Sequence, residues 1–336
     1  MEDIKFVDIS NMEWNGYIEK MEGSTFNYTA DKIDFDVEYA ENIIANESRI
    51  FLVDNRPVAA IVVYVEENNK NENTISWACN YCMAPLISTE FSYKMQEKYM
   101  EKILVYIEEL ALKHNCKEIL LKYDPLVNAS QDKRIYNYNC LLKQNYFDRS
   151  SLTQIIDLRQ EEKQLFSEIR KGHKSDIKKG NYTIEFFDKE NITEAIINEY
   201  RRIYECDAGK VTRNSEMAHH YLKFVQDGTG IVGIAKKNEE NVAVIIVTFY
   251  KNTAYYSSYA ELTEQLNGIP VGHMLQWNTM LLLKQRGIQF YEIGEQVFGK
   301  THYNNPDRKL INISNFKRGF GGYTVPFFRG IKMLEG

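Results

Sequence analysis

One order of predicted elements occurs twice along the chain, and it constrains the fold more than any other feature. Each copy reads as a hairpin of two strands, a third strand, a loop, a helix and a closing strand. In the first copy the strands cover 49–53, 58–65, 74–82 and 117–123, and the helix covers 91–114. In the second copy the strands cover 231–235, 242–250, 253–260 and 288–293, and the helix covers 271–286. The copies share this order rather than residue identity, so we infer an internal duplication.

Hydrophobic spacing separates the helices from the strands. In the helix of the first copy, Met100, Ile103, Leu104 and Ile107 recur at intervals of three and four residues, as on the buried face of a helix. The apolar run 242–250 is typical of a buried strand instead. A helix that crosses between two strands of one sheet leaves those strands parallel, whereas hairpin strands are antiparallel.

These patterns predict an α+β protein with two tandem domains, 1–150 and 151–336. Each domain is expected to contain a mixed, mostly antiparallel, twisted sheet flanked by helices, and a length of 336 residues suits two domains. The shorter predicted elements are helices over 14–21, 35–45 and 136–143, a strand over 151–158 and a strand at 311–313.

Composition excludes several classes of protein. The net charge of −6 gives no basic footprint for DNA binding, although it allows a local basic groove. We expect no transmembrane segment, because no stretch approaches the roughly 20 apolar residues that span a bilayer. The first residues lack the pattern of a signal peptide, and five scattered cysteines suit a reducing compartment, so we expect a cytoplasmic location. The histidines and cysteines show no metal-ligand spacing.

A basic segment, 160–180, separates the two copies and is expected to form a linker helix. Arg170 and Lys174 belong to its most basic part, and a few apolar residues give it one apolar face. Most charge runs are solvated helix faces, and that is one interpretation. The other is a cationic helix that faces phosphates.

The start of the helix over 271–286 is a second candidate site. Gly268, Gly272 and His273 lie at this loop-to-helix junction, where unsatisfied amide groups attract phosphate or carboxylate. The matching junction of the first copy has no glycine. If one copy binds a ligand here, we therefore expect it to be the second copy, and we expect the first domain to be non-catalytic.

Acidic and basic side chains near the ends of predicted elements supply further candidates. Glu295 and Glu261 are candidate general bases for an amine, with solvated strand ends as the alternative interpretation. Lys210 and Arg213 follow a predicted helix and are candidate contacts for a phosphate.

The stretch 311–322 carries the candidate catalytic pair, Phe316 and Lys317, followed by a glycine-rich turn that includes Gly321. Alternation of Ile311 and Ile313 predicts a strand. A lysine beside exposed amide groups would suit a negatively charged or polarised oxygen. The alternative is a basic, glycine-rich surface turn.

The duplicated unit, the basic segment between the copies and the late Phe316-Lys317 with its glycines together resemble the FemABX family of peptidoglycan-bridge aminoacyltransferases. That resemblance implies two domains of the GNAT acyltransferase fold. It also implies transfer of an acyl or aminoacyl group onto an amine, with aminoacyl-tRNA as donor, or acyl-CoA in other branches of the superfamily. The lysine of the family's Phe-Lys pair is thought to stabilise the donor carbonyl or the tRNA end, and here it matches Lys317.

Two departures from the family and superfamily patterns stand out. The long helical arm that some members use for tRNA is absent, and 267–272 only approximates the usual Gln/Arg-x-x-Gly-x-Gly/Ala loop. The first departure weakens the expectation of tRNA docking, and the second weakens that of ordinary acetyl-CoA binding.

We therefore expect a cytoplasmic N-acyltransferase of cell-wall biogenesis, acting on an amine of a peptidoglycan or amino-sugar precursor. Its expected partners are a phosphorylated or nucleotide-linked sugar or peptide acceptor and tRNA, with no permanently bound cofactor and with peripheral membrane contact left open. The alternatives are an acyl-CoA-dependent N-acyltransferase of an amino sugar or small amine, and a catalytically silent ligand-binding module.

Overall fold

The computed structural model describes residues 5–7, 11–127, 138–209, 215–266, 268, 270–301 and 305–334. Two compact units divide the chain: Met1–Ser151 with Pro326–Gly336, and Leu152–Val325. The final residues thus return to the first unit, whereas the sequence analysis placed them in the second domain. Among the described residues, no helix has the length and apolar character that a bilayer crossing requires.

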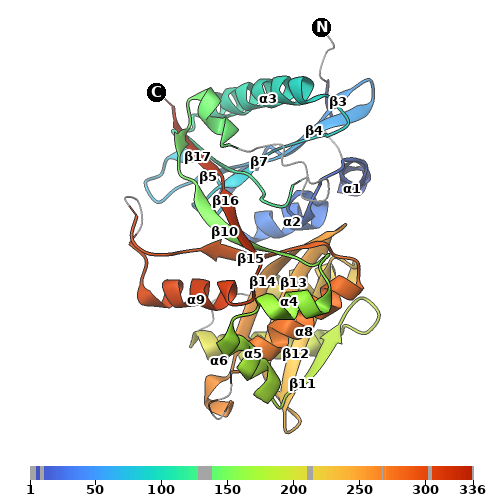
Figure 1. Ribbon diagram of the computed structural model, residues 1–336. Helices are drawn as coiled ribbons and strands as arrows, with labels where there is room; N and C mark the ends of the chain where they lie inside the picture. The colour runs from blue at the N-terminus through green and yellow to red at the C-terminus, as the bar shows by residue number, and fades with distance from the viewer. Residues whose placement is uncertain are drawn as a thin grey trace. The chain divides into compact units, whose positions relative to one another are not determined.

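The first unit is built on a sheet in which the order of strands is β1-β3-β4-β7-β8-β6-β5-β2; β17 also pairs with β8, and β9 pairs with β17. Figure 1 labels β3, β4, β5, β7 and β17 of this sheet. Its pairs are antiparallel except β6–β8 and β7–β8, which are parallel. Its elements are β1 (Lys5–Val7), α1 (Asn11–Lys20), η1 (Phe26–Tyr28), α2 (Ala30–Tyr39), β2 (Ile43–Asn46), β3 (Arg49–Val53), β4 (Arg56–Val62), β5 (Tyr64–Glu67), β6 (Asn73–Ile75), β7 (Cys82–Ile87), α3 (Tyr93–Lys113), β8 (Glu118–Lys122), η3 (Cys140–Gln144), β9 (Phe147–Asp148) and β17 (Arg329–Met333).

The second unit is built on a sheet of order β11-β12-β13-β14-β15-β10-β16. All neighbours for which a register is defined are antiparallel except β14 and β15, which α8 joins by a parallel crossover. Its elements are β10 (Ser151–Asp157), α4 (Glu162–Glu168), α5 (Lys171–Lys179), β11 (Thr183–Phe187), α6 (Glu194–Ala208), α7 (Ser215–Gln226), β12 (Gly230–Lys237), β13 (Glu240–Tyr250), β14 (Thr253–Glu261), η4 (Thr263–Gln265), α8 (Gly272–Gln285), β15 (Phe290–Gln296), α9 (Arg308–Arg318) and β16 (Tyr323–Phe327). The core between α8 and the sheet is apolar, so these mixed sheets with helices confirm the predicted α+β class.

Several predicted elements differ from the structure, and local hydrogen bonds explain two of the differences. The predicted strand at 311–313 lies within helix α9, because Asp307 accepts a hydrogen bond from the Leu310 amide at 2.8 Å and so caps a helix start. The predicted helix 35–45 begins earlier and ends at Tyr39, since Thr29 caps it and the next residues pair with β5. The predicted helix 136–143 is described only from 138 onward, where η3 forms.

The predicted strand 74–82 is broken by a tight turn between Trp77 and Asn80. Ala78 and Cys79 have φ values of 49° and 56° there. Two consecutive residues with positive φ match the turn that joins closely paired strands, but neither residue is glycine. Sequence reasoning had no turn signal at this point, so the two short strands read as one.

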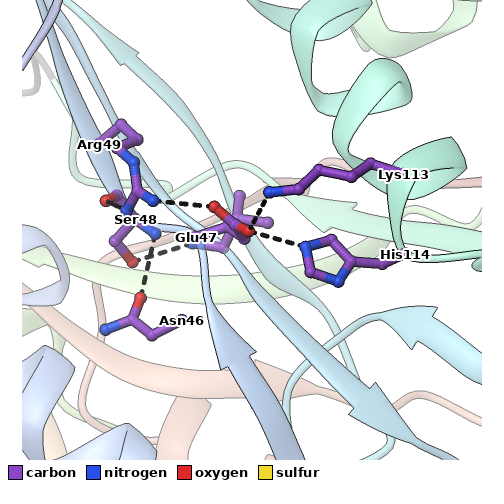
Figure 2. A network of polar contacts seen from close by, with 7 residues as sticks. Asn46, Glu47, Ser48, Arg49, Lys113 and His114 are labelled. Carbon is purple, nitrogen blue, oxygen red and sulfur yellow. Dashed lines mark hydrogen bonds and ion pairs between the residues drawn. The ribbon is translucent and has the colours of Figure 1, made fainter. Parts of the chain in front are cut away.

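A polar network fixes the end of α3 to the β2–β3 turn (Figure 2). The buried Glu47 carboxylate contacts Arg49 at 2.9 Å, Lys113 at 3.2 Å and His114 Nε2 at 2.7 Å. Burial opposes ionisation of Glu47, but the bonds from His114 and Lys113 and the charge of Arg49 outweigh it and lower the pKa of the carboxyl. Glu47 therefore binds the first unit's longest helix to its sheet.

Replacing Glu47 by Gln should lower the free energy of unfolding by about 1.5–3 kcal/mol, the range for hydrogen bonds to charged groups. Because the folded carboxyl has a lowered pKa, its contribution is present above the ordinary pKa of about 4.3 and is lost as pH falls through the folded value. Denaturant unfolding at pH 7 and pH 3.5 measures both effects. Glu97→Gln, which removes an exposed contact to Lys143, is the matched control. Equal stability of Glu47→Gln and wild type at pH 7 would contradict the assignment.

Candidate active site

The sheet of the second unit opens between β14 and β15. Parallel pairing covers only Thr253–Tyr255 against Phe290–Glu292. Beyond it, β14 continues to Glu261 along β13, while β15 continues to Gln296 along β10. A bulge at Ser257 interrupts β14 where the two strands part. The diverging strand ends form a fork in which backbone and side chains can face a ligand.

Lys317 reaches this fork from the last turn of α9. A Cβ atom placed on Gly294 of β15 would lie 2.2 Å from Lys317 Nζ, so the ammonium group rests directly on the Gly294 backbone. Lys317 Nζ also lies 5.1 Å from the centre of the Tyr256 ring of β14. Glycine at 294, whose φ is +108°, is therefore required both by its backbone angle and by the lysine.

The Lys317 ammonium has neither a hydrogen bond nor an ion pair among the residues that the structure describes. Its side chain is half-buried, and burial lowers its pKa, although the charges of Glu292 and Glu295 act in the opposite direction. A desolvated cation without a carboxylate partner is costly in a folded protein and is characteristic of functional sites. It can receive a negative charge that develops on a ligand.

Three carboxylates border the fork, in different environments. Glu292 is buried and accepts a hydrogen bond from Thr153. Glu261 accepts one from Tyr259, and burial together with the charge of Asp207 raises its pKa despite that bond. Glu295, the other predicted base, is exposed. Glu261 is thus the better placed proton acceptor of the two predicted ones, because a raised pKa brings a carboxylate closer to the range of a general base.

Side chains cover the start of α8. A Cβ on Gly272 would lie 2.6 Å from the Tyr259 hydroxyl and 3.4 Å from the Phe316 ring, and the Phe316 and His273 rings are 5.1 Å apart. Gly272 and His273 are buried, whereas Gly268 is exposed with a φ of +80°. The predicted anion site at this helix start is therefore occupied by protein side chains at Gly272 and His273.

His173 of α5 lies beside His273, with ring centres 4.1 Å apart. Burial and the neighbouring His173 lower the pKa of His273 to about 4, so the pair is neutral at pH 7. His273 Nδ1 has no hydrogen-bond partner, and it is 3.8 Å from the Asp176 carboxylate. The two rings join α5, α8 and α9 into one buried aromatic cluster.

The predicted linker helix forms as two helices, α4 and α5, which pack against the rest of the second unit instead of lying free in solvent. Leu165, Ile169 and His173 are buried, while Lys171 and Lys178 are exposed. Of the two predicted phosphate ligands, Lys174 donates to the Ser167 carbonyl at 2.7 Å and Arg170 contacts His173 Nδ1 at 3.3 Å.

The glycine-rich turn does not offer free amides. The N–H groups of Gly319, Phe320 and Gly321 donate to carbonyls of the last turn of α9, and Gln154 donates to the Gly321 carbonyl. Gly322, with a φ of +74°, lies against the Ile155 carbonyl. The expected nest of exposed amides near Gly321 is thus a helix end, and the glycines are there for close packing.

The remaining predicted phosphate ligands, Lys210 and Arg213, lie outside the described residues. Sequence reasoning missed Tyr256, Tyr259, Glu292 and His173. The tyrosines lie three positions apart on a predicted strand, which would point them to opposite faces of a regular strand, so only the bulge and the short parallel register reveal them. Among the described residues no set of histidine, cysteine and acidic side chains is placed to hold a metal.

A second group of cations lies in the first unit. Lys122 of β8 and Lys32 of α2 lie 6.0 Å and 4.7 Å from the Trp77 ring, beside the buried Asp36, and line a cavity of about 30 Å³. Burial, with the charges of Lys32 and Arg329, lowers the pKa of Lys122 to about 8. Lys32 pairs with Asp36, whereas no hydrogen bond or ion pair to Lys122 is found among the described residues.

Stability should fall in acid because of His273. Its folded pKa of about 4 is below the ordinary value of about 6.5, so the unfolded state binds the proton first. The stabilisation present above pH 6.5 is lost progressively towards pH 4, by about 1–3 kcal/mol. Denaturant unfolding between pH 7 and pH 4.5 should show a shallower loss for His273→Gln than for wild type. His219→Gln, at an exposed position, controls for loss of one imidazole; identical slopes for wild type and His273→Gln would contradict the prediction.

Comparisons with known proteins agree with this fold. No family model matches the chain, and no curated protein sequence matches it. Among solved structures, FemX matches with a TM-score of 0.66 at 13% identity, over 96% of each chain. The C-terminal domain of a putative lysylphosphatidylglycerol synthetase from Agrobacterium fabrum matches with a TM-score of 0.59 at 12% identity, over 96% of this chain and 92% of that one. A tandem GNAT protein from the clavulanic acid biosynthesis pathway matches with a TM-score of 0.52 at 10% identity, over 99% of each chain. The chain therefore has the fold that these proteins share, with two tandem GNAT-like domains.

Proposed function

We propose that the protein is an N-acyltransferase that moves an aminoacyl group from aminoacyl-tRNA onto an amine of a cell-envelope precursor in the cytoplasm. The observation that carries this proposal is Lys317, a desolvated ammonium at the fork between β14 and β15 that forms no ion pair with the residues the structure describes. A fixed cation in such a place stabilises the oxyanion of acyl transfer more than the neutral substrate.

The reaction follows from the groups at the fork. The neutral amine of the acceptor attacks the ester carbonyl of the donor, and the carbonyl oxygen becomes an oxyanion beside Lys317 Nζ. Glu261 takes the proton that the attacking nitrogen loses, since its pKa is raised and its carboxylate is held by Tyr259. The tetrahedral intermediate then collapses as the bond between the carbonyl carbon and the ester oxygen breaks, the amide forms, and Glu261 returns its proton to that oxygen, which leaves as the donor's hydroxyl.

The covered start of α8 favours aminoacyl-tRNA over acyl-CoA. An acyl-CoA pyrophosphate would need open amides at a helix start of this kind. Here the Tyr259 hydroxyl and the Phe316 ring fill the space in front of Gly272, and His273 is buried. The exposed lysines of α5, Lys171 and Lys178 among them, offer phosphate contacts for RNA instead. One structural neighbour is named for the synthesis of an aminoacylated lipid, which accords with aminoacyl transfer.

For the acceptor, Lys122 and Lys32 of the first unit are the better phosphate ligands. Arg170 and Lys174 are engaged with His173 and Ser167, respectively. The first unit, by contrast, gathers two lysines and one carboxylate about a small cavity beside Trp77, so an anionic group would complete its charge. A phosphate of a nucleotide-linked sugar-peptide fits this chemistry.

Substitution of Lys317 tests the reaction. Total tRNA charged with labelled amino acids is incubated with the protein and a nucleotide-linked muropeptide, and label transferred to the muropeptide is measured. Lys317→Met should reduce the rate by about 100-fold or more, the effect of removing one oxyanion donor. Lys300→Met, at an exposed lysine, is the control. Ribonuclease should abolish transfer, and labelled acetyl-CoA should not replace the tRNA. Full activity of Lys317→Met would refute the central role of this residue, and transfer from acetyl-CoA would refute the donor.

Substitution of Lys122 tests the acceptor site separately. Calorimetric binding of the nucleotide-linked muropeptide should weaken by about 10-fold or more in Lys122→Met, since a charge-assisted contact contributes about 1.5–3 kcal/mol. Because the pKa of Lys122 is about 8, affinity for the wild type should fall as the pH rises above 8, when the ammonium loses its proton. Lys70→Met, in an exposed turn, serves as the control. Unchanged affinity of Lys122→Met would place the acceptor phosphates elsewhere.

A further inference from the structure

His173 is a polar residue of the basic segment that is nevertheless buried, with 2% of its surface exposed. It lies on α5, and its ring packs against His273, Phe316 and Phe320 at centre distances of 4.1, 5.5 and 4.9 Å. A basic helix on the surface does not require a buried histidine. Its enclosure points to a role within the protein rather than towards solvent.

The two ring nitrogens of His173 have distinct partners, and these fix its protonation. Nδ1 lies 3.3 Å from the Arg170 guanidinium, which can only donate, so Nδ1 is the acceptor. The proton of the neutral ring is then on Nε2, which donates to the Phe316 carbonyl at 2.9 Å. Arg170 therefore selects the tautomer that can bond to α9.

The Phe316 carbonyl precedes Lys317 in the chain and belongs to the last turn of α9. The Gly319 amide also bonds to this carbonyl, at 3.0 Å, and the Arg170 amide donates to the Gly319 carbonyl at 2.8 Å. A Cβ on Gly319 would lie 2.1 Å from His173 Nε2, so only glycine allows the imidazole to reach the helix end. Two hydrogen bonds from the start of α5 thus hold the turn that carries Lys317.

We propose that His173, oriented by Arg170, is a positioning residue that holds the end of α9 so that Lys317 Nζ rests on Gly294 at the fork. The basic segment then acts by placing the cation. The catalytic consequence rests on the proposed function, but the positioning itself does not, because it concerns the place of one ammonium group in the protein without substrate.

The test observes Lys317 directly in the full chain. Lysine Nζ and Cε signals are followed by NMR through a pH titration, with Lys317→Met to assign the signal, and the rate of reductive methylation of Lys317 is measured by mass spectrometry. His173→Leu removes the hydrogen-bond donor and puts an apolar side chain of similar size in place of the imidazole. The pKa of Lys317 should then rise towards the free value of about 10.4, and methylation at neutral pH should change by about threefold or more as the ammonium leaves its place. His173→Gln, whose amide can still donate to the Phe316 carbonyl, should restore values near the wild type.

Arg170→Met keeps the test decisive if His173→Leu does not fold. It removes only the group that selects the tautomer, at an exposed position, and should shift the Lys317 signal in the same direction by a smaller amount. His219→Leu, at an exposed histidine, should leave the signal unchanged. If His173→Leu folds and its Lys317 titrates as in the wild type, the proposal is overturned. If His173→Leu does not fold, the same result in Arg170→Met overturns it. That result would leave the proposed acyl transfer standing, because the Lys317→Met assay decides transfer independently.

Discussion

The second unit is organised around an ammonium group for which the described part of the chain provides no ion-pair partner. Lys317 loses hydration when α9 places it against Gly294 and Tyr256, and the charges of Glu292 and Glu295 do not outweigh the effect of burial on its pKa. Such a group lowers stability unless something else is gained. Three features of the surroundings hold the ammonium in place despite its loss of hydration: a glycine under the ammonium, an aromatic face beside it and a helix end fixed by His173. If Glu292 moved within ion-pair distance, the lysine would be more stable and less able to receive a developing negative charge.

The glycines near the site follow from the same geometry. Gly294 admits the lysine, Gly272 admits the Tyr259 hydroxyl, and Gly319 admits the His173 imidazole. In each case the missing Cβ lets a polar side chain from another element approach the backbone. A glycine of this kind marks where a neighbouring polar atom must fit, which differs from a flexible loop that cradles a phosphate.

Sequence patterns were sufficient for the duplication, the strand hairpins and the two crossing helices, because these depend on long apolar runs with a clear period. They also singled out Phe316 and Lys317. They placed this pair after a strand, since Ile311 and Ile313 alternate, while the Asp307 cap that makes the segment helical is a single residue just before it. The fork, and with it Tyr256 and Tyr259, depends on where two strands stop pairing. That register is set by contacts between residues about 35 positions apart, which no local pattern encodes.

The two halves of the duplication have diverged in charge as well as in sequence. Each has a half-buried lysine next to an aromatic ring at the strand that follows its crossing helix: Lys122 on β8, and Lys317 resting on β15. In the first unit Lys32 and Asp36 share the small cavity with the lysine, whereas in the second unit the lysine faces an open fork. A small cavity that gathers two lysines and one carboxylate suits recognition of a fixed anion, and an open fork suits an oxygen whose charge appears only during reaction. In the proposed function, the first unit has a binding role of its own, and the reaction takes place at the fork of the second unit.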